Sequence, residues 1–329
     1  MKKILLTLAC VFGMSMAALA VQNSAVMLQH DGNITTYEPE QINDAIEAAK
    51  DGDVIYLTAG DFPGFTINKE ISVKGYGMMT VIKDAITVEN TEKILNNVFI
   101  GYMEMDNCYI KSQVNNLKIS QCRFKRGLFF MGITDNSLID RCYFTFPGGS
   151  GGLDISGTYE ETVTVNGVTS TYRRSYIKGL SVVNSEVRAV NGINNSISLG
   201  VSFINCLIGD EYTKKLTGAK IINSIIRSSS SHGTDLSKTE IISSSYGSKW
   251  ISFDSDCTLS NCYEVDIEDY TSEDLVTNGY LGNDGTVIGP MGGNTPYTLE
   301  PALPHVTKAD MKVDPDKQQL NVTLTVSPK

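Results

Sequence analysis

The residues of this sequence best suited to binding a ligand are aromatic side chains at repeating positions. Tyr109 and Phe129 are 20 residues apart, and each lies within a short apolar stretch. Alternate residues of a strand point to opposite sides, so burial of their apolar neighbours would leave both rings outside and in register. Trp250, the only Trp, has the same placement between Lys249 and Ile251. Exposed rings suit the apolar faces of sugars, so the expected partner is a polysaccharide or a cell-surface glycan.

Two arginines, Arg173 and Arg174, directly follow a segment with a hairpin pattern. Residues 162–171 carry alternating β-branched side chains around Asn166 and Gly167, which is a strong signal for a two-residue turn between strands. We expect a hairpin insertion at about residues 147–174. Insertions in repeat proteins tend to lie on the working face, so the two arginines are candidate ligand-binding residues.

Asp254 and Asp256 are the nearest approach to a metal site in this sequence. A lyase that uses calcium needs a carboxylate cluster beside a basic residue that abstracts a proton. Two aspartates beside a tight turn are more typical of an ordinary loop, and the sequence contains no phosphate-binding glycine loop and no Cys/His set with zinc spacing. The sequence therefore predicts no catalytic set and no cofactor, and Ca²⁺ is expected only if the protein is a lyase.

The elements that must position these side chains are short strands at a near-constant interval of about 20 residues. Each repeat has an apolar residue, then a variable one, then Asn, Gln, Arg or Ser, and then Cys or Ser. One interval, between Ile139 and Val182, is longer because it holds the predicted hairpin. The repeat predicts an all-β, right-handed, single-stranded parallel β-helix, whose interior column is formed by Ile119, Ile139, Val182, Phe203, Ile221, Ile241 and Leu259.

The polar position of each repeat predicts a tight turn. Asn tolerates left-handed backbone angles, and its side-chain amide can bond to the amide of the next coil. The Cys or Ser that follows is expected to point inward, where small thiols pack well. We therefore predict that the six cysteines after residue 20 are free, with core positions for Cys122, Cys142, Cys206 and Cys262.

The N-terminal residues 1–20 have the pattern of a signal peptide. Two lysines precede an uncharged run that ends in Ala18, Leu19 and Ala20. Cleavage would change the net charge from −10 to −12. The sequence thus predicts an exported protein, in the periplasm, on the outer cell surface or outside the cell, with no transmembrane segment after cleavage. Its net negative charge argues against nucleic acid and anionic membranes as partners.

Both ends of the predicted solenoid are expected to be capped. Residues 39–53 begin with Pro39 and show apolar residues at helical spacing, which predicts an N-terminal capping helix. The solenoid, with this cap, would occupy residues 21–278 as one domain. The tail, residues 279–329, has alternating strands at 306–313 and 320–326 that predict a C-terminal hairpin over the far end.

The start of the solenoid resembles the pectin-lyase-like superfamily of parallel β-helix proteins. The likeness rests on the helix, on the strand from Gly52 to Leu57, on the turn Gly60 to Phe62 and on the stretch Ile71 to Gly75, and it covers residues 39–265. The tail resembles uncharacterised secreted β-helix proteins of gut-type Gram-negative bacteria. The resemblance implies the fold but no activity.

The motifs of enzymes in that superfamily are incomplete in this sequence. Polygalacturonase-like members need clustered aspartates, a Gly-His-Gly and an Arg-x-Lys, whereas this chain offers only the fragment around His232. We therefore predict a glycan-binding or adhesive protein. The alternatives are a polysaccharide lyase or glycoside hydrolase with a divergent site, and a structural surface protein. Carboxylates that converge with a Lys or Arg in a groove would favour the enzyme.

Overall fold

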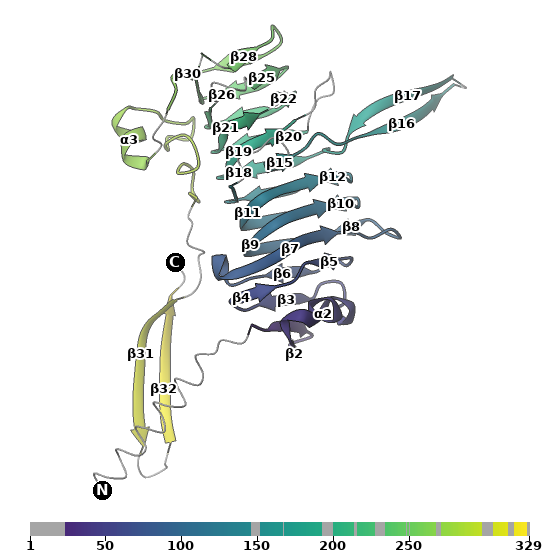
Figure 1. The fold of residues 1–329 in the computed structure, drawn as a ribbon. Helices are drawn as coiled ribbons and strands as arrows, with labels where there is room; N and C mark the ends of the chain where they lie inside the picture. Colours follow the sequence, from purple (N-terminus) through teal and green to yellow (C-terminus); the bar gives the residue numbers. More distant parts are fainter. Residues whose placement is uncertain are drawn as a thin grey trace.

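The computed structural model describes residues 24–145, 152–166, 168–192, 200–213, 216–227, 234–247, 249, 251–267, 271–297, 305–314 and 319–327. It confirms the predicted architecture, because the chain winds into a right-handed parallel β-solenoid of about nine turns. The coils stack along one axis, and the hairpin of β16 (Thr158–Val165) and β17 (Val168–Ser175) projects from one side (Figure 1). The predicted signal peptide lies outside the described residues.

Each coil contributes strands to successive faces of the solenoid, which we call faces 1 to 4 in chain order. Face 1 consists of β3 (Val54–Leu57), β6 (Ser72–Lys74), the starts of β9 (Phe99–Ile110) and β11 (Lys118–Phe130), β13 (Ser137–Asp140), β18 (Leu180–Val183), β20 (Val201–Ile204), β23 (Lys220–Ile222), β26 (Glu240–Ile242) and β29 (Thr258–Ser260). Face 2 consists of β4 (Gly60–Phe62), the start of β7 (Thr80–Val88), the middles of β9 and β11, β14 (Tyr143–Phe144), the start of β19 (Glu186–Asn191), the start of β21 (Leu207–Thr213), β24 (Ile225–Ile226), β27 (Ser245–Tyr246) and β30 (Tyr263–Glu264).

Faces 3 and 4 complete the coil. Face 3 consists of β5 (Phe65–Ile67), the ends of β7, β9 and β11, β15 (Gly152–Asp154) and the ends of β19 and β21. Face 4 consists of β8 (Leu95–Asn96), β10 (Val114–Asn115) and β12 (Thr134–Asp135), and in later coils of β22 (Leu216–Thr217), β25 (Thr234–Ser237) and β28 (Ile251–Phe253).

The predicted interior column on face 1 is present with the predicted register. Ile119 pairs with Ile139, Ile139 with Val182, and the same step repeats through Phe203, Ile221, Ile241 and Leu259. All are buried except Leu259, which is 42% exposed. It belongs to the last coil, and no further coil covers it.

The polar position of each repeat is a left-handed turn, as the sequence predicts. Its φ values lie between 46° and 63° at Tyr102, Gln121, Arg141, Asn184, Asn205, Asn223, Ser243 and Asn261. Asn adopts this region at least cost among residues with a side chain. The turn sends the chain from face 1 to face 2 in eight successive coils, so one backbone conformation at one spacing determines the bend, with Asn at four of the eight positions.

The Cys or Ser that follows the turn points inward and bonds to the backbone. The hydroxyl oxygens of Ser185 and Ser224 accept hydrogen bonds, both 3.0 Å long, from the backbone N–H groups of Cys142 and Cys206. The described cysteines are all free, and Cys108, Cys122, Cys142 and Cys206 are buried. Burial raises the pKa of the Cys206 thiol to about 12, which keeps it protonated and unreactive.

An amide ladder exists, but at a second turn that the sequence analysis did not single out. This turn lies between faces 4 and 1, where Asn97 and Asn116 also have positive φ values. Asn116 donates to Asn97 at 3.2 Å, and the preceding Asn115 donates to Asn96 at 3.1 Å. The predicted ladder between Asn184, Asn205 and Asn223 is wrong, because the tail covers that turn and bonds to the side chains of Asn184 and Asn223.

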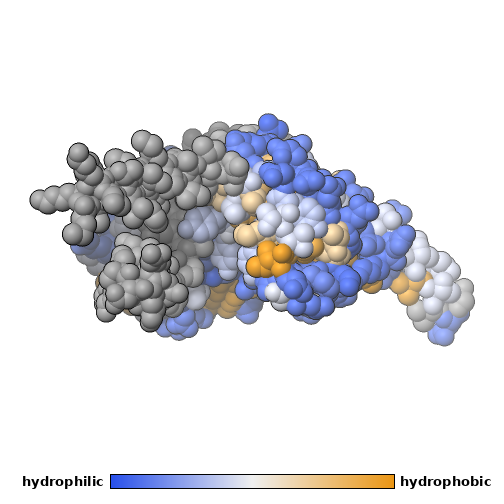
Figure 2. Space-filling view, turned by 90° about the horizontal axis from the view of Figure 1, so that it is seen from below, coloured by the Kyte–Doolittle hydropathy of each residue, from blue (hydrophilic) through white to orange (hydrophobic). Residues whose placement is uncertain are grey.

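The N-terminal end is capped as predicted. β1 (Val26–His30) pairs with β2 (Asn33–Tyr37) and with β3, and a 3₁₀ turn η1 (Pro39–Gln41) leads into helix α2 (Ile42–Ala48). The helix buries its apolar stripe, Ile42, Ala45 and Ile46, against the first coils. Viewed from this end, the described surface is mostly hydrophilic with small apolar spots (Figure 2), so the cap hides the core.

The inserted arm is narrower than the predicted span of 147–174. Its strands are β16 (Thr158–Val165) and β17 (Val168–Ser175), paired in the predicted register around Asn166. β15, which that span includes, pairs instead with β11 of the neighbouring coil. Leu153 and Ile155 are fully buried, so this stretch belongs to the coil and not to the arm.

The tail runs back along the side of the solenoid. After helix α3 (Ser272–Thr277), residues 280–297, which we call the strap, lie across the face 1 to face 2 turn and over face 2. The predicted hairpin is present as β31 (His305–Asp314) and β32 (Gln319–Ser327), but it forms a sheet of its own (Figure 1). The far end is therefore not capped by the described tail, since Leu259 stays exposed.

Candidate functional site

Face 3 carries the aromatic column that the sequence predicts. Tyr109 and Phe129 are register partners on adjacent coils, and their rings stack with centroids 5.1 Å apart and an interplanar angle of 22°. Both rings are half-buried, whereas their neighbours Cys108 and Leu128 are fully buried. The alternation along each strand thus directs the rings outward, as predicted.

Gly127 leaves space for the ring of Phe129. A Cβ atom placed on Gly127 would lie 3.0 Å from the Phe129 ring and 2.6 Å from the carbonyl oxygen of Gly152. Any larger residue would push the ring off the face or separate the two coils. The placement of the Phe129 ring above the sheet therefore depends on residue 127 being glycine.

The column continues into polar residues on both sides. Thr87 is the register partner of Tyr109 on one side, and Asp154 and Asn191 follow Phe129 on the other. Asp154 accepts hydrogen bonds from the Asn191 side chain at 2.9 Å and from the Ser156 hydroxyl at 2.6 Å. These bonds orient the carboxylate and the amide, so face 3 presents two rings flanked by sugar-compatible polar groups.

The arm begins beside this column. Tyr159 at its base stacks on Tyr176 with centroids 5.8 Å apart, and the Lys178 ammonium lies 5.8 Å from the Tyr159 ring centroid. The two predicted arginines lie at the same base of the arm, where Arg174 is the register partner of Tyr159. Arg173 donates to Thr158, and Arg174 forms an ion pair with Glu161. They are on the arm and not in the aromatic column.

Several other predicted site residues do not join the column. Trp250 and His232 lie outside the described residues, and β28, the strand next to Trp250, belongs to the face 4 sheet with β25. The carboxylate of Asp254 accepts from the backbone N–H of Asp256 at 3.0 Å, which is a loop contact. Within the described ranges, no group of three or more His, Cys, Asp and Glu side chains could hold a metal ion.

Face 2 carries a charged column that the sequence analysis missed. Glu104, Arg123, Tyr143 and Glu186 are successive register partners. Glu104 is nearly buried and forms ion pairs with Arg123 at 3.2 Å and with Lys125 at 2.6 Å. The residues are 19 to 43 apart in sequence, and only the coil register brings them together.

The upper part of this charged column is covered by the strap. Arg188 pairs with Glu186 at 2.8 Å and lies 5.3 Å from the centroid of the Tyr143 ring. Tyr297 of the strap lies against Tyr143 with ring centroids 6.4 Å apart. Burial, followed by the nearby Glu186 carboxylate, raises the pKa of Tyr297 and of Tyr143 above the usual range, so both phenols stay protonated at neutral pH.

The strap is held by the left-handed turn. The Asn184 side chain donates to the carbonyl oxygens of Pro290 and Gly292 at 3.2 and 2.6 Å, and the Asn223 side chain accepts from the Asn283 N–H at 2.9 Å. Asn184 and Asn223 are almost completely buried. The strap thus replaces the water that would otherwise satisfy these amides.

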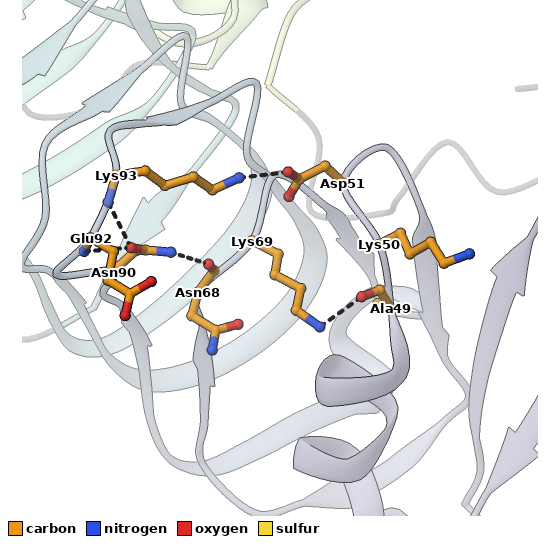
Figure 3. A pocket seen from close by; sticks show the side chains of 8 residues that line it. All are labelled: Ala49, Lys50, Asp51, Asn68, Lys69, Asn90, Glu92 and Lys93. Atoms are coloured by element: carbon orange, nitrogen blue, oxygen red, sulfur yellow. Dashed lines mark hydrogen bonds and ion pairs between the residues drawn. The ribbon is translucent and has the colours of Figure 1, made fainter.

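A depression of about 640 Å³ lies between α2 and the first coils (Figure 3). Two of its lysines bond to neighbouring groups: Lys69 donates to the carbonyl oxygens of Ile46 and Ala49 at the end of α2, and Lys93 bonds to Asp51 at 2.5 Å. The Lys93 ammonium is the main cause of the lowered pKa of Asp51. These contacts fasten the cap, so we assign the depression a structural role.

No family model, curated protein or solved structure matches this chain. In the part of the chain that the structure describes, no helix is long and apolar enough to cross a membrane. The candidate sites therefore rest on geometry alone. Face 3 offers an open aromatic column, and face 2 offers a charged column that is paired internally and partly covered.

Proposed function

We propose that this chain is an exported β-solenoid protein that binds a neutral glycan along face 3. The observation that carries the proposal is the stacked, half-exposed pair of Tyr109 and Phe129. The two rings stand next to each other on an open face, where an extended chain of sugar rings can contact them without a deep pocket. The pectin-lyase-like resemblance supports the same ligand class, and the signal-peptide pattern supports export.

The polar end of the column favours a neutral ligand. Asp154 lies one coil beyond Phe129, and its carboxylate is fixed by Ser156 and Asn191. A carboxylate is a strong acceptor for sugar hydroxyls, whereas it repels uronates and sulfated sugars. The net charge of −10 also disfavours binding of acidic glycans.

The test is retardation in gels that contain neutral or acidic polysaccharides. We expect binding to a neutral polysaccharide that weakens about fivefold for Tyr109→Ala or Phe129→Ala, since an aromatic contact contributes about 1 kcal/mol. The double variant should not bind. Tyr76→Ala is the control, because Tyr76 is exposed but lies outside face 3.

Two results would overturn this proposal. Unchanged binding by the double variant would exclude the aromatic column as the site. Failure of every polysaccharide to retard the unaltered protein would favour the structural surface protein instead.

A second candidate function, a polysaccharide lyase or hydrolase, is favoured by the convergence of Glu104, Arg123, Tyr143 and Glu186 on face 2. Against it, both carboxylates are engaged in ion pairs within the solenoid and the pKa of the Tyr143 phenol is raised, so none of these groups is available as a free base. Release of new chain ends from a polysaccharide, abolished by Tyr143→Phe and not by Tyr109→Ala, would support the enzyme.

A further inference from the structure

The arm carries a second group of aromatic side chains, on one side of its two strands. In the register of β16 and β17, Tyr159 is paired with Arg174, and Glu161 is paired with Tyr172. Because every second residue of a strand points to the same side, Tyr159 and Tyr172 lie on the same side of the arm. The arm projects from the solenoid (Figure 1) and Tyr172 is 47% exposed, so a ligand can reach this side.

The aromatic side of the arm joins the solenoid through Tyr176. The rings of Tyr159 and Tyr176 stack with an interplanar angle of 16°, and both are half-buried. The next residue, Ile177, is buried and forms a β-bridge with Thr134 of face 4, so Tyr176 points outward from the solenoid. Three tyrosines thus follow one another from the solenoid surface onto the arm, and we call Tyr176, Tyr159 and Tyr172 the arm row.

The arm row begins close to the polar end of the face 3 column. Asp154 follows Phe129 in that column, and three residue steps lead from Asp154 to Gly157 at the start of the arm, which is at most about 11 Å of chain. A Cβ atom placed on Gly157 would lie 2.3 Å from the Tyr176 ring and 2.7 Å from the carbonyl oxygen of Phe130. The Tyr176 ring is therefore near the end of the strand that carries Phe129.

We propose that the arm row extends the face 3 site, so that a long neutral glycan contacts Tyr109 and Phe129 with one part and the arm row with another. This inference rests on the proposed function of face 3, because continuity with that site identifies the occupant. Stacked rings suit the apolar faces of sugars in both places. The charge of Arg174 is balanced by its ion pair with Glu161, so the arm, like the column, suits a neutral chain.

The arm then determines the preference of the protein for chain length. A short oligosaccharide is held by the column alone, whereas a longer one gains the contacts of the arm row. The experiment measures, by calorimetry, the binding of cello-, manno- and xylo-oligosaccharides from about two to about eight sugars long. For the unaltered protein, we expect the affinity to rise up to the longest chains.

Deletion of residues 159–174, with a two-residue turn joining Thr158 to Ser175, is the first variant. It removes two rings of the arm row, each worth about fivefold in affinity. We therefore expect about twentyfold weaker binding of the longest oligosaccharides and unchanged binding of the shortest. Tyr109→Ala, in the column, should instead weaken the binding of short and long chains alike.

Tyr172→Ala is the second variant, and Thr171→Ala is its matched control. Thr171 is adjacent in sequence, but it lies on the other side of the arm, where its hydroxyl bonds to that of Thr162. Tyr172→Ala should weaken the binding of the longest oligosaccharides about fivefold, and Thr171→Ala should leave it unchanged. Circular dichroism checks that each variant is folded.

Two outcomes separate this inference from the proposed function. If the deletion variant and Tyr172→Ala bind long oligosaccharides as tightly as the unaltered protein does, or lose affinity equally for short and long ones, the arm row is not an extension of the site. Binding to face 3 would then stand, provided that Tyr109→Ala weakens it. Failure of every oligosaccharide to bind the unaltered protein would overturn the proposed function as well.

Discussion

Faces 2 and 3 are built from the same repeat, yet they present different surfaces. On face 3 the outward residues include two stacked rings that remain half-exposed. On face 2 they include acidic, basic and phenolic groups that pair with one another and lie under the strap. Coil register brings residues together on both faces, and coverage by the tail determines which column is open to a ligand.

A change in the shared core should destroy both faces. Ile139→Asp places an unpaired carboxylate in the dry interior beneath them, where Ile139 is 1% exposed, at a cost of several kcal/mol. We expect loss of the cooperative thermal transition in circular dichroism. Leu138→Asp, at the adjacent half-buried position of β13, is the control and should still fold. Equal damage from both substitutions would contradict the assigned register.

A change at the turn should loosen face 2 alone. Asn184→Ala loses two hydrogen bonds to the strap and leaves alanine in the left-handed region, for a total of about 2 to 4 kcal/mol. Asn261→Ala introduces the same backbone strain, but Asn261 is exposed. We therefore expect this substitution to lower the free energy of unfolding by only about 1 to 2 kcal/mol. Chemical denaturation measures both. Equal losses would show that the strap adds nothing.

Alkaline pH should lower the stability of the packing between the strap and face 2. The raised pKa of Tyr143 and Tyr297 means that the folded state retains their protons longer than the unfolded state does. Their stabilisation is therefore complete below the unfolded pKa of about 10 and is lost as pH rises toward the folded values. Denaturation curves between about pH 9 and 11 should show this loss, and Tyr297→Phe should reduce it. A slope unchanged by that substitution would contradict the assignment.

Among these changes, deletion of the arm is expected to alter the stability of the protein least. Deletion of residues 159–174, with a two-residue turn joining Thr158 to Ser175, should change stability by less than about 1 kcal/mol, because the described strands of the arm pair only with each other. A deletion from Gly149 to Thr171 removes β15 and the buried Leu153 as well, and should destabilise strongly. Similar melting temperatures for the two deletions would place β15 outside the coil.

The sequence alone determined the coil. A period of about 20 residues, one apolar position and one turn position were sufficient to predict the column from Ile119 to Leu259, the left-handed turns and the outward rings of Tyr109 and Phe129. These features depend on local chemistry: strands alternate their sides, and asparagine adopts a left-handed turn at low cost. Because the same residue types recur in successive coils, these local preferences can be recognised from a single sequence.

Only the tertiary structure decided what covers each face. The contacts of Asn184 with Gly292 and of Tyr143 with Tyr297 join residues more than 100 positions apart, and no period marks them. The charged column on face 2 escaped prediction because Glu104, Arg123 and Glu186 carry no motif and meet only through register. The path of the strap depends on packing between distant surfaces, which a repeat pattern does not encode.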